Sequence, residues 1–251
     1  MPSISRTGRG LAAAAAAALL LATAPSALAA TSAITGSISP NKGPIGSPFT
    51  LNIGFTITPT TDGEQPTLNR VTLMFPNNAR PNGAIFPVCT AEAINAKRGR
   101  FTSCPAGSRI GGGRVLADVP NADVFNVPAT LTIFNGGANK VTIHVYATNP
   151  VLISEAFSGT IQRVGGRYGY KVDFVLPDSL QEISDGWFAV EKRVTSTIGA
   201  TRVIRGRRRG YLESTTLCPR ALRVPIAGTF DFRAGHGEGP TSAEGSIACR
   251  R

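Results

Sequence analysis

Five of the eight residues from Arg202 to Arg209 are arginines, and they offer the clearest chemistry in the chain. They are Arg202, Arg205, Arg207, Arg208 and Arg209. Guanidinium groups at this density create a positive potential, and each can make a bidentate contact with phosphate or carboxylate. The sequence therefore predicts that these arginines, at a hairpin tip or in a connecting loop, bind an anionic cell-wall polymer or another acidic surface. The alternative is a solvated loop that only keeps the protein soluble.

The same segment lacks the aromatic residues that single-stranded nucleic-acid sites place among their basic ones. Tyr211 alone follows it. Stacking of bases on aromatic rings supplies much of the affinity at such sites. We therefore expect no specific nucleic-acid partner.

The surroundings of the two histidines do not predict a metal or cofactor site. His144 alternates with apolar neighbours, so we expect it on the polar, outward face of a strand. His236 and Glu238 lie between glycines in a loop, where an imidazole and a carboxylate could bind a metal weakly or support catalysis. Such a site must hold its groups rigidly, however, and glycines favour mobility. We expect no metal and no cofactor.

Acidic residues gather in one stretch of the second half of the chain. They are Asp173, Asp178, Glu182, Asp185 and Glu191, with Lys171, Lys192 and Arg193 among them. This mixture favours a salt-linked surface. The alternative is a carboxylate pair of an extracellular hydrolase, for example one acting on carbohydrate, because geometry and not spacing defines such pairs. A serine nucleophile is not indicated, since the chain has no Gly-x-Ser-x-Gly.

The four cysteines favour disulfides over a metal site, because Cys-x-x-Cys and Cys/His spacings are missing. Four cysteines allow three pairings. Local pairing, Cys89 with Cys104 and Cys218 with Cys249, is the simplest prediction. The other pairings would tie the early loop to the C-terminal strands.

Apolar residues alternate with polar ones along several segments, which is the period of a β-strand with one buried face. The alternation is strict in 49–57, 141–146 and 224–232. Looser strands are expected at 70–75, 114–119, 129–134, 152–164, 168–175, 187–198, 210–216 and 241–248. Turns are expected at 135–139, at Gly165–Gly166 and at Gly111–Gly113, and one helical turn at 91–96.

Many short strands separated by turns predict an all-β fold, an antiparallel β-sandwich of Ig-like or jelly-roll-like type. We expect one secreted domain over residues 30–251. Two packed β halves, divided near 120–128, are the alternative.

Residues 1–29 have the composition of a secretory signal peptide. A short basic segment with Arg6 and Arg9 precedes an apolar run, and Ala27-Leu28-Ala29 is a cleavage site of the A-x-A type. No later segment offers 18 consecutive apolar residues, so no transmembrane segment is expected after cleavage. The sequence thus predicts a secreted, extracellular protein, released or associated with the cell wall, in an oxidising compartment.

Two cysteine-containing segments resemble a family of uncharacterised secreted actinobacterial proteins. The first is Phe86-Pro87-Val88-Cys89 followed by Cys104-Pro105-Ala106-Gly107-Ser108-Arg109-Ile110-Gly111-Gly112-Gly113, and the second is Thr216-Leu217-Cys218-Pro219 with Thr229-Phe230-Asp231-Phe232 and Cys249. The resemblance covers about residues 70–113 and 210–251. It implies secretion, a disulfide-bonded β domain and an actinobacterial origin, and it brings no catalytic or binding residue with it.

Together these features favour a non-enzymatic, basic, disulfide-stabilised β-sandwich protein at the cell envelope or outside the cell. The net charge of +11 agrees with an acidic partner. The hydrolase with a carboxylate site remains the alternative.

Overall fold

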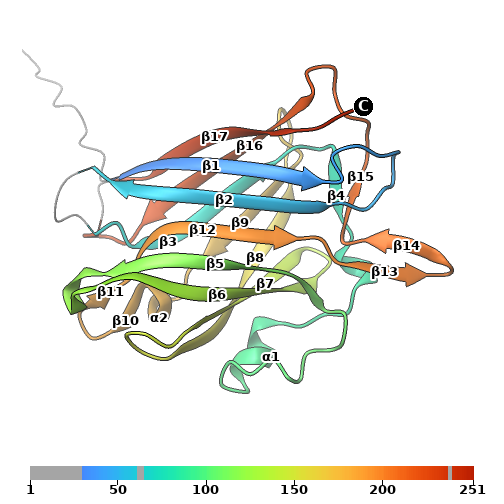
Figure 1. Ribbon diagram of the computed structural model, residues 1–251. Coiled ribbons are helices and arrows are strands. Elements are labelled where there is room, and N and C mark those ends of the chain that lie inside the picture. The colour runs from blue at the N-terminus through green and yellow to red at the C-terminus, as the bar shows by residue number, and fades with distance from the viewer. Residues whose placement is uncertain (1–29, 61–64, 237–238) are drawn as a thin grey trace, which may run out of the picture.

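The computed structural model describes residues 30–60, 65–236 and 239–251. Most of the chain forms antiparallel strands (Figure 1). The main sheet contains β1 (Ala30–Ser39), β2 (Thr50–Pro59), β3 (Leu68–Phe75), β5 (Arg109–Val119), β6 (Val124–Gly137), β7 (Lys140–Ala147), β8 (Ile153–Arg163), β9 (Tyr170–Val175), β12 (Val190–Ile198), β16 (Arg223–Phe232) and β17 (Thr241–Ala248). The predicted signal peptide, residues 1–29, lies outside the described residues.

The remaining elements are short. They are β4 (Ala79–Pro81), β10 (Glu182–Ser184), β11 (Trp187–Phe188), β13 (Thr201–Ile204), β14 (Arg207–Gly210), β15 (Leu212–Ser214), the α-helices α1 (Ala91–Asn95) and α2 (Asp178–Gln181), and the 3-10 turns η1 (Gly83–Ile85) and η2 (Pro120–Ala122). The predicted helical turn at 91–96 is therefore α1. No helix in the described ranges is long and apolar enough to cross a membrane.

The eleven strands follow the order β1-β2-β12-β5-β6-β7-β8-β9-β3-β16-β17. β1, β2, β12, β5 and β6 form one wall, and the rest curl behind it (Figure 1). The two edge strands, β1 and β17, contact each other, and the hydroxyls of Ser32 and Thr241 lie 3.2 Å apart. The sheet is thus nearly closed on itself, and the predicted all-β antiparallel sandwich is confirmed. Residues 120–128, the alternative boundary between halves, fall in the β5–β6 hairpin of this sheet.

Strand β2 shows why the strictly alternating segments fold as they do. Its odd positions, from Leu51 to Ile57, are buried, while Thr56 and Asn52 face outward. The buried side chains of both walls meet in one core, where the rings of Phe55 and Phe230 lie 4.6 Å apart. Burial of these apolar faces is the main favourable contribution to folding.

The expected turn at Gly111–Gly113 is wrong, because these residues continue β5. Strand β12 passes so close to them that a Cβ on Gly111 would lie 2.1 Å from the carbonyl oxygen of Thr197, and one on Gly113 would lie 2.1 Å from that of Thr195. The glycines therefore serve close strand packing and not chain reversal.

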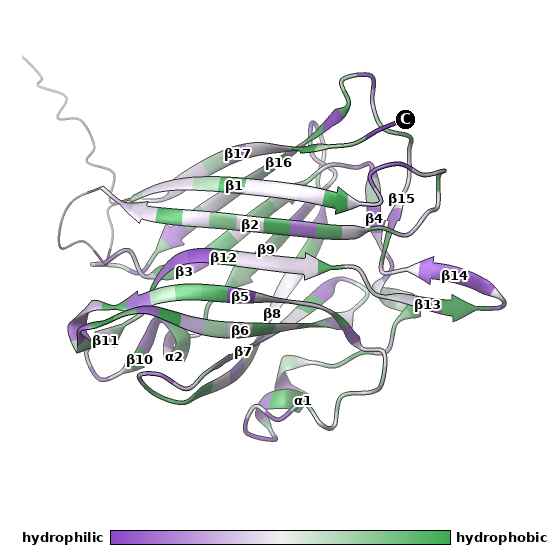
Figure 2. Ribbon diagram, viewed as in Figure 1, coloured by the Kyte–Doolittle hydropathy of each residue, from purple (hydrophilic) through white to green (hydrophobic). Residues whose placement is uncertain are grey.

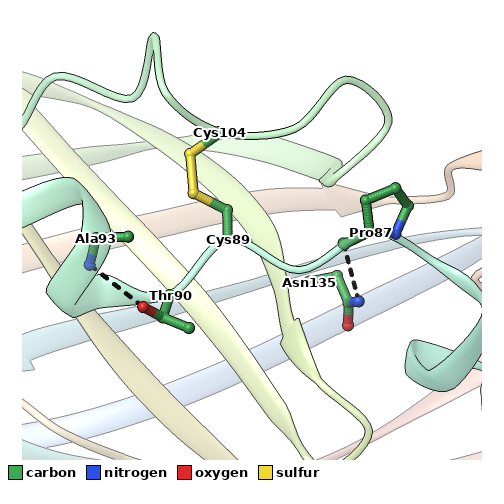
Figure 3. The surroundings of a disulfide bond; sticks show 6 residues. All are labelled: Pro87, Cys89, Thr90, Ala93, Cys104 and Asn135. Atoms are coloured by element: carbon green, nitrogen blue, oxygen red, sulfur yellow. Dashed lines mark hydrogen bonds between the residues drawn. A yellow bond between two sulfur atoms is a disulfide. The ribbon is translucent and has the colours of Figure 1, made fainter.

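The segment from Phe86 to Ser108 covers the outer face of β6, β7 and β8, and the first disulfide fixes it there (Figure 3). Thr90 caps α1 by accepting a hydrogen bond from the N–H of Ala93 at 3.2 Å. The buried Asn135 amide donates to the carbonyls of Gly83, Phe86 and Pro87 at 2.9–3.1 Å. The carbonyl groups of this irregular segment cannot form sheet hydrogen bonds. The Asn135 side chain therefore supplies the hydrogen-bond donors that they need.

Both disulfides of the structure are local: Cys89–Cys104 and Cys218–Cys249. The second joins the segment after β15 to the end of β17 at Cys249. Each closes a loop, of 15 and 31 residues in sequence separation. Such cross-links stabilise the fold by about 3–4 kcal/mol each, chiefly through the unfolded chain.

Candidate anionic-ligand site

The arginine-rich segment forms a two-stranded hairpin, β13–β14, that projects from one end of the sandwich (Figure 1). Arg202 pairs with Arg209, and Ile204 pairs with Arg207. The two turn residues, Arg205 and Gly206, have φ angles of 49° and 74°. Positive φ at both positions is typical of the tight turns that match the twist of a hairpin. The predicted hairpin tip is therefore present, and β14 is among the most hydrophilic strands (Figure 2).

Two of the five predicted arginines anchor the base of the hairpin. Arg209 makes a bidentate ion pair with Glu213, at 2.7 and 3.0 Å, and Arg80 contacts the same carboxylate at 3.1 Å. Arg202 donates to the carbonyl of Ile85, and its guanidinium lies 6.0 Å from the centre of the Phe86 ring. These contacts fix the direction in which the hairpin projects.

Glu213 is 1% exposed and is charged in this environment. Burial alone would raise its pKa, but the hydrogen bonds from Arg209, Arg80 and the N–H of Gly210 outweigh burial and lower the pKa to about 2. A buried carboxylate of this kind needs its cations, because an unpaired buried charge is costly.

The other three arginines point their charge at solvent. Arg205, Arg207 and Arg208 are exposed, and no carboxylate of the described residues forms an ion pair with them. Arg208 donates to the hydroxyl of Thr201 at 3.3 Å. Three guanidinium groups within four residues, none of them in an ion pair of the described residues, can contact successive charges of an anionic chain.

A polar trough begins at the foot of this hairpin and crosses the outer face of β1, β2, β12, β5 and β6. Its volume is about 1020 Å³, and Gly199 and Ala200, which lead into β13, line one end. Hydroxyl and amide groups cover its floor. For example, the Thr197 hydroxyl donates a hydrogen bond to the Asn52 amide oxygen, and the Asn52 amide nitrogen donates one to the Ser37 hydroxyl. Arg109 and Arg114 also line it, and none of its described lining residues is acidic. The basic surface of the hairpin is thus continued by a hydrogen-bonding surface whose charged lining residues, Arg109 and Arg114, are both cationic.

The predicted salt-linked surface is present for three of the five acids. Arg70 binds Asp173 at 2.8 Å and thereby lowers its pKa, while Arg233 contacts Asp178 at 3.1 Å and Glu182 at 3.3 Å.

Glu191 differs from its neighbours in sequence, because it is buried. It lines an apolar cavity, and the N–H of Leu68 donates to its carboxyl group at 3.2 Å. Burial raises the pKa of Glu191 to about 8. Glu191 is the one carboxylate among the described residues that line this cavity.

The expectation that His144 is an ordinary outward residue is wrong. The side chain lies on the outer face of β7, but the segment carrying Gly99 and Phe101 covers it and leaves it 2% exposed. Its ring contacts the hydroxyl of Ser154 at 3.1 Å, and burial lowers its pKa. The sequence could not show this, because the cover comes from a segment far away in the chain.

His236 packs its ring on Phe188, with 3.9 Å between the ring centres. Arg233 lies over the same Phe188 ring at 5.6 Å. The neighbouring Glu238, the expected partner of His236 in a metal or catalytic site, is outside the described residues. Among the residues that are described, no group of three or more His, Cys, Asp or Glu side chains is placed to hold a metal ion.

Comparison with known proteins adds little to this geometry. No family model matches the chain, and no curated protein matches it. Among solved structures, the chain is similar to the T6 backbone pilin of serotype M6 Streptococcus pyogenes, with 12% identity and a TM-score of 0.29 over 87% of this chain and 36% of the pilin. The chain thus spans about a third of the pilin's length, and this similarity is too low to carry an argument. Fold and site define a disulfide-stabilised, antiparallel β-sandwich with a projecting basic hairpin.

Proposed function

We propose that this protein is a secreted, non-enzymatic binding module of the cell envelope that holds an anionic polymer with the β13–β14 hairpin. The observation that carries the proposal is that Arg205, Arg207 and Arg208 are exposed and form no ion pair with a described carboxylate, while Arg202 and Arg209 anchor the base of the hairpin. Because Arg202 and Arg209 hold the base, the hairpin backbone is already ordered before binding, so less conformational entropy is lost when a ligand binds. The two disulfides suit such a module in an oxidising compartment.

The trough explains how a polymer, rather than a single anion, would be bound. A chain whose charged groups contact the hairpin can continue past Gly199 over the hydroxyl-rich floor toward Arg109 and Arg114. Hydroxyl and amide groups there would hydrogen-bond to the uncharged parts of a polyol or sugar chain. The absence of acidic residues from the described lining means that nothing in the trough repels the polymer's anionic groups.

The test compares wild-type protein with the triple variant Arg205→Ser, Arg207→Ser, Arg208→Ser on isolated cell-wall material and on DNA, from low to high salt. Arg209 is left in place because its loss would also disturb Glu213. The triple variant should elute at lower salt, and on DNA the slope of log affinity against log salt should become shallower by about 2–3, because about 0.7–0.9 is lost per phosphate contact.

The matched control removes three charges elsewhere, in the variant Lys97→Ser, Arg100→Ser, Arg220→Ser. These residues are exposed and take part in no ion pair of the described residues. Retention of the control should stay close to that of the wild type. Equal retention of all three proteins at every salt concentration would mean that the hairpin does not bind the polymer and only keeps the protein soluble.

A further inference from the structure

Two apolar cavities lie inside the sandwich, one behind the other. The first, of about 180 Å³, lies at the end that carries the hairpin, β4 and β15. The second, of about 200 Å³, lies toward α2 and β11 and is lined by side chains such as Val119, Val127 and Leu180. Protein interiors are normally packed without voids of this size, so two of them in one core leave room for an apolar ligand.

The two cavities are neighbours along the long axis of the sandwich. Phe75, Val141, Val172 and Ile198 line both of them, so a single layer of side chains separates the two spaces. These four residues come from four different strands of the nearly closed sheet. Rotamer changes at this layer would join the cavities into one narrow, apolar channel. That shape fits an alkyl chain better than a compact ring.

The outer end of the first cavity is cationic. Lys42 and Arg250 line it, both are exposed, and neither forms an ion pair with a carboxylate of the described residues. Arg80 lines it as well but is held by Glu213. No Asp or Glu occurs among the described lining residues of this cavity. The Cys218–Cys249 disulfide is part of the same rim and ties its two segments together.

A buried hydroxyl group without a partner lies in the same cavity. Tyr211 lines it and is 2% exposed, and its hydroxyl has no hydrogen-bond partner among the described residues. A buried hydroxyl that makes no hydrogen bond is costly, so native structures usually supply an acceptor. A carboxylate oxygen in the cavity would be such an acceptor.

We propose that the interior of this sandwich binds a single-chain anionic amphiphile, a fatty-acid-like molecule. Its alkyl chain lies in the two apolar cavities. Its carboxylate lies in the first cavity, where Tyr211 donates a hydrogen bond and Lys42 and Arg250 balance the charge. This site is separate from the hairpin and does not depend on polymer binding.

The size of the cavities sets the expected chain length. An engineered apolar cavity of about 150 Å³ holds benzene, a molecule of six carbons. Two cavities of about 180 and 200 Å³ therefore hold about twelve to fifteen carbons, between one six-carbon group in each cavity and the number in proportion to their combined volume. Each buried methylene should tighten binding about fourfold until the channel is full.

The test is calorimetric titration of the purified protein with saturated fatty acids of 8 to 16 carbons, below their micelle concentrations. Affinity should rise about fourfold per methylene and level off at about twelve to fifteen carbons. Dodecyltrimethylammonium, which has the same chain and the opposite charge, should bind at least about tenfold more weakly, because it meets Lys42 and Arg250.

Tyr211→Phe is the sharpest variant, since it removes one hydroxyl group that has no structural partner. It should keep the melting temperature of the wild type and weaken dodecanoate binding about tenfold, the loss expected for a hydrogen bond to a charged group. Lys42→Ser with Arg250→Ser should weaken it by a similar factor. The variant Lys97→Ser, Arg100→Ser, which also removes two exposed charges, serves as the matched charge control and should bind dodecanoate like the wild type.

Three results would each overturn the proposal. They are an absence of heat with every fatty acid at two well-separated temperatures, since apolar burial can have an enthalpy near zero at one of them, an affinity that keeps rising beyond 16 carbons as in surface adsorption, and equal affinity of Tyr211→Phe and the wild type for dodecanoate. Failure of the polymer experiment would leave this proposal standing, because the two sites use different residues.

Discussion

The Glu213 carboxylate offers the most quantitative test of the structure, through the substitution Glu213→Gln. In the folded protein its pKa is about 2, against an ordinary value of 4.5. Because the folded pKa is depressed, the ion pair stabilises the fold at all pH values above 4.5, and that contribution is lost as the pH falls from 4.5 toward 2. A difference of this size corresponds to about 3 kcal/mol.

The contribution of the Glu213 ion pair is smaller than this value, because its two cations are partly exposed to water. The side chains of Arg209 and Arg80 are 34% and 48% exposed. Solvent screening of the two guanidinium groups reduces the contribution to about 2 kcal/mol. For a chain of this length, that is a decrease of roughly 4–8 °C in the melting temperature of Glu213→Gln at pH 7.

The assay is thermal unfolding of both proteins, followed by circular dichroism, at pH 7, 5, 4, 3 and 2. The gap between wild type and Glu213→Gln should be largest at pH 7 and should close as the pH approaches 2. Glu244→Gln is the control, because Glu244 is 66% exposed and its ion pair with Arg167 lies at the surface. A gap for Glu213→Gln that stays constant from pH 7 to pH 2 would refute the reasoning, since it would mean that Glu213 is not charged in the fold.

Three further predictions concern the core and the loop that covers it. Glu191→Gln should raise the melting temperature at pH 8 and not at pH 4. Because the pKa of Glu191 is about 8 in the folded protein, this residue destabilises the fold as the pH rises from 4.5 to 8. An equal change in melting temperature at both pH values would count against this prediction. Phe230→Ala should destabilise the protein by about 3–5 kcal/mol in denaturant unfolding, because Phe230 is fully buried; a loss below 1 kcal/mol would contradict the packing with Phe55. The double variant Cys89→Ser, Cys104→Ser should lower the free energy of unfolding by about 3 kcal/mol. It should also speed amide hydrogen exchange in residues 90–103 more than in β16. Uniform acceleration would show that the disulfide does not act locally.

Strands with a buried and an exposed face could be predicted from the sequence, because their alternation records the two environments directly. The segments 224–232 and 241–248 coincide with β16 and β17 to within one residue. The predicted strand 187–198 is broken instead at Ala189, whose N–H donates to the carbonyl of Gln181 and leaves the ladder. β1 was not expected, because serine, threonine and glycine dilute its alternation of Ile34 and Ile38.

The parts of the candidate site that the sequence could not predict depend on long-range contacts. The arginine cluster is visible in the chain, but its division into anchored and ion-pair-free groups depends on the burial of Glu213 beside the distant Arg80 and on the contact of Arg202 with the distant Ile85. The burial of His144 and Glu191 likewise depends on which segments cover them. The Tyr211 hydroxyl has no local signature at all, since its lack of a partner is a property of the folded interior.

The order of strands in the sheet also determines when the protein can fold. β2 pairs with β12, as in the contact between Asn52 and Thr197, 145 residues apart, and the edges meet through Ser32 and Thr241, 209 residues apart. Non-local pairings of this kind form slowly, because a long loop must close before they are gained. The core between the two walls cannot be completed until almost the whole chain is present. Until β16 and β17 have been made, the apolar faces of the earlier strands lack the partners that bury them in the finished core.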